Sequence, residues 1–338
     1  MPLPSKTSDK MNVLIVLPSV IPAHKYGGTE RVIWYLGMEL KALGHQVTYL
    51  VNEGSTCHFA PVLFLDRSKP LSDQIPADTD IVHFHYVNPG EISKPYVITM
   101  HVNDSHLGPL DKNTIFISRN QAERFGSETY VHNGLSWDDY GPPDLLGKKK
   151  AFHFLGNAAW RVKNVQGAID IIKLTKHERL NVLGGRRLNI KMGFRLTISP
   201  RVSFYGMVGG EEKNNLLRSS KGLIFPVRWH EPFGLAIIES LYFGCPVFGT
   251  PYGSLPELVT KDVGFLSNRV SELAEAITQS SSYSKERCHE YAVEEFNSQK
   301  MTMRYVEKYE HVIAGNKLNT THPQNTLIES RGHLPFLP

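Results

Sequence analysis

Two glutamates, Glu231 and Glu239, have the residue type and spacing of a ligand site. They lie eight positions apart, separated by the turn Pro232-Phe233-Gly234 and by an apolar run that leads to the second glutamate. This pattern predicts Glu231 in a loop and Glu239 inside the following helix, with both facing one ligand and the helix N-terminus open to an anion. Two acceptors for hydroxyls beside a phosphate-binding helix end would suit a nucleotide sugar.

The surroundings of the pair strengthen this interpretation. A strand is predicted over 222–227, directly before the motif, and ligands of open parallel sheets bind beyond the carboxyl ends of strands. A glutamate among Leu235, Ile237 and Leu241 would be costly to bury without partners. The plainer alternative is that Glu239 is a solvated residue on the polar face of its helix.

Arg161 and Lys163 follow a second predicted strand, over 151–155. A diphosphate leaving group gains negative charge as it departs, and fixed cations stabilise that charge. The alternative is a pair of solvated cations at the start of a helix. An N-terminal helical turn disfavours cations unless an anion is present.

Glycines and histidines mark the first half of the chain. Gly27 and Gly28 precede a predicted helix, without the spacing of a dinucleotide fingerprint, and a plain turn is the alternative. His101 ends a predicted strand over 96–101 and should point towards a cleft. Asp104 and His106, in the next loop, are weaker candidates for contact with an acceptor.

Metal binding is not expected. His83 and His85 share one face of a predicted strand and could chelate a metal, but no nearby Cys, Asp or Glu completes a site at ligand spacing. Asp78-Thr79-Asp80 has the D-x-D form of manganese-dependent transferases, and a turn before a strand is the better interpretation.

Composition indicates an ordinary soluble protein. A length of 338 residues predicts two domains, and the net charge of +4 fits an anionic substrate or an anionic membrane surface without requiring either. Nothing in it points to nucleic acid. The three cysteines are far apart and form no disulfide framework, and no signal peptide or membrane span is visible. We expect a cytoplasmic protein, with a peripheral contact between Lys148-Lys149-Lys150 and an anionic membrane as an alternative to a solvated charge run.

Alternating strands and helices predict an α/β fold with two Rossmann-like, doubly wound domains that face a cleft. Residues 1–145 would form an acceptor-side domain and residues 146–285 a nucleotide-sugar domain. Helical periodicity continues over 285–314, and the C-terminal helices within 286–315 could cross back to the first domain. The polar segment 316–338 is expected to be a loose tail.

The second half resembles the nucleotide-sugar site of family-4 glycosyltransferases, which have the GT-B fold. The resemblance rests on the E-x7-E pattern of Glu231 and Glu239, followed by Gly244-Cys-Pro-Val-Phe-Gly-Thr and by Gly253-Ser-Leu-Pro-Glu257. It implies transfer of a sugar, with retained anomeric configuration and no metal or other cofactor, from a nucleoside diphosphate sugar to a hydroxyl of a carbohydrate, lipid-linked or small-molecule acceptor.

The resemblance also implies individual roles. Glu231 would hold hydroxyls of the donor sugar and Glu239 the ribose. Backbone amides of Phe233, Gly234 and Leu235 would meet the sugar or its phosphate. Gly27 and Gly28 would lie near the phosphates and the acceptor, and His101 beside the transferred sugar.

The chain departs from the family pattern where the phosphate cations are expected. The family has Gly-Arg where this chain has Gly156-Asn157, and Lys163 comes one residue late, so Arg161 could replace the missing arginine. Two other classes stay open: a nucleotide-sugar epimerase or phosphorylase of the same fold, and a binding module without turnover.

Overall fold

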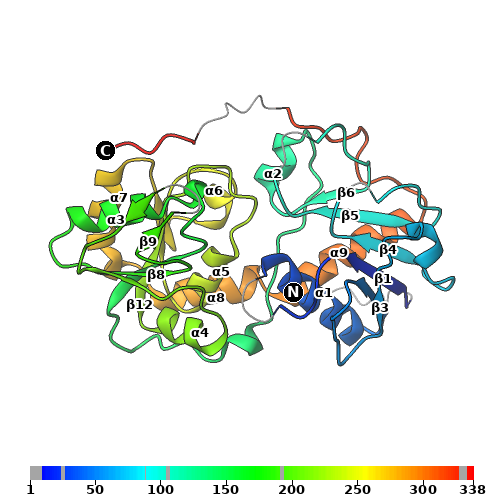
Figure 1. Cartoon of the computed structure of the whole chain (residues 1–338), viewed down its shortest axis with the longest axis horizontal. Coiled ribbons are helices and arrows are strands. Elements are labelled where there is room, and N and C mark those ends of the chain that lie inside the picture. The colour runs from blue at the N-terminus through cyan, green and yellow to red at the C-terminus, as the bar shows by residue number, and fades with distance from the viewer. Residues whose placement is uncertain (1–9, 24–26, 88, 104–106, 191–193, 327–332) are drawn as a thin grey trace.

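The computed structural model describes residues 10–23, 27–87, 89–103, 107–190, 194–326 and 333–338. Its strands form two six-stranded sheets and one two-stranded ribbon. Figure 1 shows the two sheets in separate halves of the molecule, the N-terminal half on the right and the C-terminal half on the left.

The N-terminal sheet has the strand order β3-β2-β1-β4-β5-β6, and its paired strands are parallel. Its strands are β1 (Asn12–Leu17), β2 (Gln46–Val51), β3 (Val62–Phe64), β4 (Ile81–Phe84), β5 (Tyr96–Met100) and β6 (Thr114–Phe116). The C-terminal sheet repeats this topology as β11-β8-β7-β12-β13-β14, again with parallel pairs. Its strands are β7 (Ala151–Leu155), β8 (Leu180–Leu183), β11 (Val202–Phe204), β12 (Ser220–Phe225), β13 (Val247–Gly249) and β14 (Gly264–Leu266). Both sheets therefore have the doubly wound strand order, and the predicted fold class is confirmed.

Burial on both faces of the sheets explains the continuous apolar runs of the strands. In β1, Val13 and Ile15 pack into one core cluster, while Leu14 and Val16 pack into another on the opposite face. A strand buried on both faces has no polar positions to alternate, so its sequence becomes uniformly aliphatic.

The helices cover these sheets. They are α1 (Gly28–Ala42), α2 (Arg119–Arg124), α3 (Val165–Leu174), α4 (Gly210–Arg218), α5 (Leu235–Tyr242), α6 (Leu255–Leu258), α7 (Val270–Thr278), α8 (Lys285–Glu295) and α9 (Ser298–Ile313). Short 3-10 turns occur at Leu71–Gln74, Trp137–Tyr140, Arg161–Lys163 and Ser280–Ser282.

The helical periodicity over 285–314 corresponds to two helices. The chain breaks at Phe296 and Asn297, and the Asn297 side chain caps α9 by accepting a hydrogen bond from the Lys300 amide. The break lets the chain change halves: α8 packs against α5, whereas α9 packs against α1 and β5. Figure 1 shows α9 beneath the N-terminal sheet.

The tail is not loose where the structure describes it, which corrects the prediction for 316–338. The amides of Asn319, Gln324 and Thr326 donate to carbonyls of the N-terminal half. After the undescribed residues 327–332, the amides of Leu334 and Leu337 donate to Arg228 and Asn268 of the C-terminal half. These backbone hydrogen bonds hold the described parts of the tail against both halves.

Within the described residues, no helix is both long and apolar enough to cross a membrane. Cys57, Cys245 and Cys288 are free thiols, as their spacing predicted.

Candidate functional site

A cavity of about 760 Å³ lies between the two sheets. This volume is within the range of roughly 300–1,000 Å³ that is typical of small-molecule sites. Residues at the carboxyl ends of β5, β7, β8 and β12 line it, where open α/β sheets bind ligands. The predicted site residues that line it are Gly27, Gly28, His101, Lys163, Glu231, Phe233, Gly234, Leu235 and Glu239.

Glu231 forms a buried ion pair with Lys163. The Lys163 Nζ lies 2.8 Å from Oε1 and 2.6 Å from Oε2, and the Trp229 indole donates to Oε2 at 2.8 Å. The same ammonium lies over the rings of Phe225 and Trp229, 5.3 and 5.1 Å from their centroids. Glu231 is therefore oriented by a cation that is itself part of the cavity wall.

A glycine fixes the loop that carries Glu231. Gly253 has φ of +64°, and a Cβ at this position would lie 2.2 Å from the Glu231 amide nitrogen. Next to it, the Ser254 amide donates to the Glu231 carbonyl at 2.9 Å. Only glycine fits this conformation and this approach, so the Gly253-Ser254 loop holds the Glu231 backbone in place.

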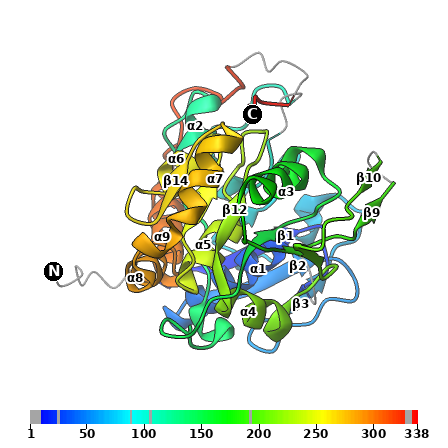
Figure 2. The same cartoon turned by 90° about the vertical axis from the view of Figure 1, so that its left-hand side faces the viewer.

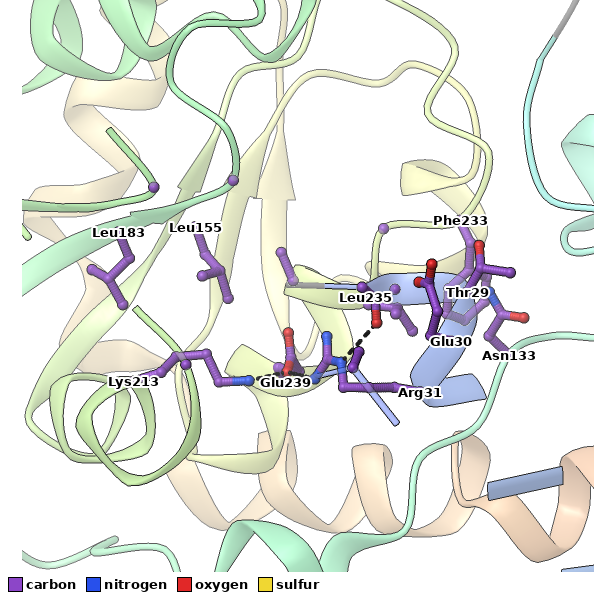
Figure 3. Close-up of a pocket in the computed structure, with 18 of the residues that line it drawn as sticks. Thr29, Glu30, Arg31, Asn133, Leu155, Leu183, Lys213, Phe233, Leu235 and Glu239 are labelled. Atoms are coloured by element: carbon purple, nitrogen blue, oxygen red, sulfur yellow. Dashed lines mark hydrogen bonds and ion pairs between the residues drawn. The ribbon is translucent and has the colours of Figure 1, made fainter. Parts of the chain in front are cut away.

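Glu239 is buried in α5 and accepts three hydrogen bonds through Oε1. The donors are Arg31 at 2.7 Å, the Tyr140 hydroxyl at 2.8 Å, and Lys213. Figure 3 shows Glu239 between Lys213 and Arg31. Burial alone would raise the pKa of Glu239, but the two cations outweigh it and hold the pKa well below its usual range. The solvated alternative for Glu239 is therefore wrong.

The network around Glu239 joins the two halves. Arg31 belongs to α1 of the N-terminal half, whereas Lys213 belongs to α4 of the C-terminal half. Burial would lower the pKa of Arg31, but its attraction to Glu239 raises it. Burial lowers the pKa of Lys213 despite the same carboxylate. Both cations depend on Glu239 for compensation of their charge.

Two helix ends meet across the cavity. Gly28 begins α1, and a Cβ there would lie 3.3 Å from Cδ1 of Leu235, the first residue of α5. Gly234, with φ of +88°, allows the chain to turn into α5 directly after Phe233. Small residues at both starts keep the two helix N-termini close to one ligand space.

His101 lines the cavity on the N-terminal side and is held from behind by a second histidine. Its Nε2 lies 2.9 Å from Nδ1 of His85, and burial lowers the pKa of His101 to about 4. His83 packs against His85 and hydrogen-bonds Tyr309 and Thr99, each at 2.7 Å. His83 and His85 are thus parts of a hydrogen-bonded core that leaves His101 neutral near pH 7.

Arg161 does not line this cavity, although it was paired with Lys163 in the prediction. Its 3-10 turn separates the two side chains, and Arg161 lines a second cavity of about 360 Å³. The proposed substitution of Arg161 for the family arginine is therefore not supported by its position. Asp104 and His106 lie outside the described residues.

Two further cations that reach the main cavity, Arg31 and Lys213, were missed. Each is the fourth residue of its helix, since α1 begins at Gly28 and α4 begins at Gly210. A cation in the first helical turn is unfavourable unless an anion lies nearby. The positions of these two cations in the sequence could therefore have indicated an anion site. Among the described residues, no cluster of three or more His, Cys, Asp or Glu side chains could hold a metal ion.

Sequence comparison assigns the second half of the chain. Residues 149–282 match the family described as "Glycosyl transferases group 1". A curated relative, an uncharacterized 41.2 kDa protein in the cps region of Klebsiella pneumoniae, is 29% identical over 153 residues. That match covers 43% of this chain and 40% of the relative, so it spans less than half of the relative's length.

Solved structures resemble the whole fold. AviGT4, a glycosyltransferase involved in avilamycin A biosynthesis, has a TM-score of 0.72 and 20% identity, over 90% of this chain and 98% of its own. Sucrose-phosphate synthase from Thermosynechococcus elongatus has a TM-score of 0.70 and 16% identity, over 91% and 100%. HepE from Anabaena, in complex with UDP and glucose, has a TM-score of 0.65 and 16% identity, over 89% and 99%. The chain thus has the GT-B fold, and its second half carries a glycosyl transferases group 1 domain, which confirms the predicted enzyme class for that domain.

Proposed function

We propose that this protein transfers a sugar from a nucleoside diphosphate sugar to an acceptor hydroxyl. The observation that carries the proposal is one cavity, shared by both halves, in which Glu231 and Glu239 are each held by buried cations. The bond from the anomeric carbon to the diphosphate oxygen breaks. A bond to the acceptor oxygen forms, and the acceptor proton passes to the oxygen of the departing diphosphate.

Glu231 is suited to the donor sugar. Its carboxylate is fixed by Lys163 and Trp229 and has lone pairs left for sugar hydroxyls. Lys163 then lies beside the sugar, where the diphosphate leaves. Glu239 is suited to the ribose, because its position on α5 is about one turn beyond the amides of the helix N-terminus.

The diphosphate would be held by Lys163, Arg31, Lys213 and the N-termini of α1 and α5. Preorganised cations and helix ends stabilise charge that develops on a leaving group. In this proposal these groups take the role at the phosphates that the sequence analysis gave to Arg161. They would perform the role that a metal ion has in metal-dependent transferases, so metal independence is part of the proposal.

His101 would contact the transferred sugar as a neutral hydrogen-bonding group. Its Nε2 faces His85, and its pKa of about 4 keeps the imidazole uncharged at neutral pH. We include retention of anomeric configuration in the proposal, on the resemblance to family-4 glycosyltransferases.

The donor to test first is a UDP-sugar, because HepE, which shares the fold, was crystallised with UDP and with UDP-glucose. The acceptor is a carbohydrate, lipid-linked or small-molecule hydroxyl. Isothermal titration calorimetry with UDP-, GDP- and ADP-glucose, on the wild type and on Glu231→Gln, tests the donor site. One of the three nucleotide sugars should bind to the wild type. The Glu231→Gln protein should bind that nucleotide sugar more weakly than the wild type does, but should keep its affinity for the free nucleoside diphosphate.

Turnover is tested by incubating the bound donor with an acceptor panel and measuring release of nucleoside diphosphate. Release that depends on an acceptor supports the proposal. Conversion of the donor to a sugar epimer without acceptor would show an epimerase instead. Tight binding with an intact donor across the panel would show a binding module.

A further inference from the structure

Residues 333–338, the terminal segment, dock on the C-terminal half of the molecule. The Leu337 amide donates to the Asn268 carbonyl at 2.7 Å, and the Val270 amide, at the start of α7, donates to the Leu337 carbonyl at 2.8 Å. Figure 2 shows the C-terminus beside α3 and α7, as Figure 1 does from another side. The terminal segment therefore has a defined place against these two helices.

Phe336 anchors the terminal segment to α3. Its ring packs against the buried cluster that includes Ile169 and Ile172. A Cβ on Gly167 would lie 2.6 Å from Cε1 of this ring and would also meet the side chain of the cap residue Asn164. Glycine inside a helix is destabilising relative to alanine, and here its missing side chain leaves the space that the Phe336 ring fills.

Leu334 and Pro335 attach the terminal segment to two parts of the chain that flank the Glu231 loop. The Leu334 amide donates to the Arg228 carbonyl at 2.9 Å, and the Arg228 Nε donates to the Leu334 carbonyl at 2.8 Å. The Tyr252 hydroxyl donates to the Pro335 carbonyl at 2.6 Å. Arg228 and Tyr252 are far apart in the sequence, so the terminal segment connects them in space.

Arg228 leads to the groups that orient the Glu231 carboxylate. Its amide donates to the Val162 carbonyl at 2.7 Å, directly before Lys163, which pairs with Glu231. The next residue, Trp229, donates its indole N–H to the same carboxylate. A change in the Arg228 backbone would therefore reach both partners of Glu231.

Tyr252 leads to the loop that holds the Glu231 backbone. It directly precedes Gly253, which approaches the Glu231 amide, and Ser254, whose amide donates to the Glu231 carbonyl. Among the described residues that line the main cavity, none belongs to the terminal segment. The terminal segment can therefore affect a bound ligand only through the loops that it holds.

We propose that the terminal segment is a positioning element for the donor sugar: when docked, it holds the Glu231 loop and the Gly253-Ser254 loop in the arrangement that binds the sugar. A misplacement of about 1 Å can lower an enzymatic rate by roughly a hundredfold, so release of the segment should impair transfer. The cations near the diphosphate keep their charge when the segment is released. The contact between Glu231 and the sugar rests on the proposed function, whereas the hold of the terminal segment on the Glu231 loop does not.

Amide hydrogen exchange of the ligand-free protein tests the positioning directly. Phe336→Asp places a carboxylate among apolar side chains and should release the terminal segment, which faster exchange of the Val270 amide reports. Leu334→Pro lacks the amide that donates to Arg228 and is the second means of release. In the released protein the amides of Arg228 and Ser254 should exchange several-fold faster than in the wild type. Unchanged exchange at these two amides, with the Val270 amide released, would overturn the proposal.

Turnover tests the consequence for the sugar. Phe336→Asp should lower kcat/KM for the nucleotide sugar by roughly tenfold, while the Kd of the free nucleoside diphosphate should change by less than about twofold. Phe336→Leu keeps an apolar side chain and should behave as the wild type. Tyr252→Phe removes one hydrogen bond and should lower kcat/KM by about twofold to threefold. Wild-type kcat/KM in a released protein would overturn the role in transfer. Faster exchange in a protein without acceptor-dependent turnover would instead keep the positioning and remove the proposed glycosyl transfer.

Asn319→Ala is the matched control, because it loosens the same tail on the other half of the molecule. The Asn319 side chain donates to the carbonyls of Lys112 and Thr114 in the N-terminal half. Its loss should speed exchange there and leave the amides of Arg228 and Ser254 as in the wild type. Equal acceleration at these two amides in Asn319→Ala and Phe336→Asp would show a general loss of stability and would overturn the proposal.

Discussion

Glu231 and Glu239 are the same residue type, and both are buried in one cavity, yet their surroundings differ. Glu231 is paired within the C-terminal half by Lys163, a cation that also has two aromatic rings beneath it. Glu239 holds Lys213 from its own half and Arg31 from the other half. The two glutamates therefore have different roles. Glu231 is placed to contact substrate, whereas Glu239 also connects the two halves in the absence of substrate.

The largest effect is expected for Glu231→Gln on turnover. The variant keeps the size of the side chain but loses the charge that orients Lys163, so kcat/KM should fall by roughly 10²–10³-fold. The matched control is Glu178→Gln. Glu178 is also paired with a lysine, Lys221, at 2.7 Å, but it does not line the cavity. Near wild-type kcat/KM in a folded Glu231→Gln protein would remove Glu231 from the proposed role.

Glu239→Gln should instead show its largest effect in stability. It leaves Arg31 and Lys213 close together and without their shared counter-charge, which should cost roughly 3 kcal/mol of unfolding free energy. Urea denaturation followed by circular dichroism measures this loss. In Glu231→Gln the loss should be smaller, about 1 kcal/mol, because Lys163 keeps an amide acceptor and its aromatic neighbours. Equal losses in the two variants would contradict the contrast between the glutamates.

The cations can be separated by calorimetry with a nucleoside diphosphate. Lys163→Met should weaken binding by roughly tenfold to a hundredfold, because it removes a fixed charge beside the diphosphate. Arg161→Gln should leave the affinity unchanged, since Arg161 lines the other cavity. If Arg161→Gln weakened binding and Lys163→Met did not, Arg161 would be the substitute for the family arginine. Lys163 would then have no role at the diphosphate.

The smallest expected effect is the pH dependence of the Glu239 contribution. Its folded pKa is depressed, so the stability it provides is present above its unfolded pKa of about 4.5 and is lost as the pH falls through lower values. Burial also lowers the pKa of His101 to about 4 and of His153 to about 3, which destabilises any variant as the pH falls below 6.5. The difference in unfolding free energy between wild type and Glu239→Gln therefore isolates Glu239. It should be constant from pH 7 to pH 5 and shrink below pH 4.5. A difference that is unchanged at pH 3.5 would show that Glu239 is not held ionised by its cations.

Most of the fold could be predicted from the sequence, because short aliphatic runs alternate with helical periodicity in both halves. The strand predicted over 151–155 is β7 at Ala151–Leu155, and the strand predicted over 222–227 is β12 at Ser220–Phe225. The break between α8 and α9 was missed, because Asn297 caps a helix within an otherwise helical pattern and its effect depends on which half each side packs against.

The candidate site was predictable where its residues are close in sequence. Glu231, Phe233, Gly234, Leu235 and Glu239 share one loop and helix, and the structure places all of them at the cavity. Arg31 and Tyr140 reach Glu239 from 208 and 99 residues away, so only the folded arrangement of the two halves brings them there. Arg161 shows the opposite error: two residues from Lys163, it turns to the other side of its 3-10 turn.

The return of α9 to the N-terminal half has a consequence for synthesis on the ribosome. Met301, Tyr305 and Tyr309 belong to the same buried cluster as Val13 and Ile15, so this core needs residues that are made after the entire C-terminal sheet. At about 5–20 residues per second, the interval between the end of β6 and the start of α9 lasts roughly 10–40 s. The core of the half that is made first is therefore completed only after the C-terminal sheet has been made. A ribosome-arrested chain that exposes residues up to 296 should contain a protease-resistant C-terminal half and a protease-sensitive N-terminal half.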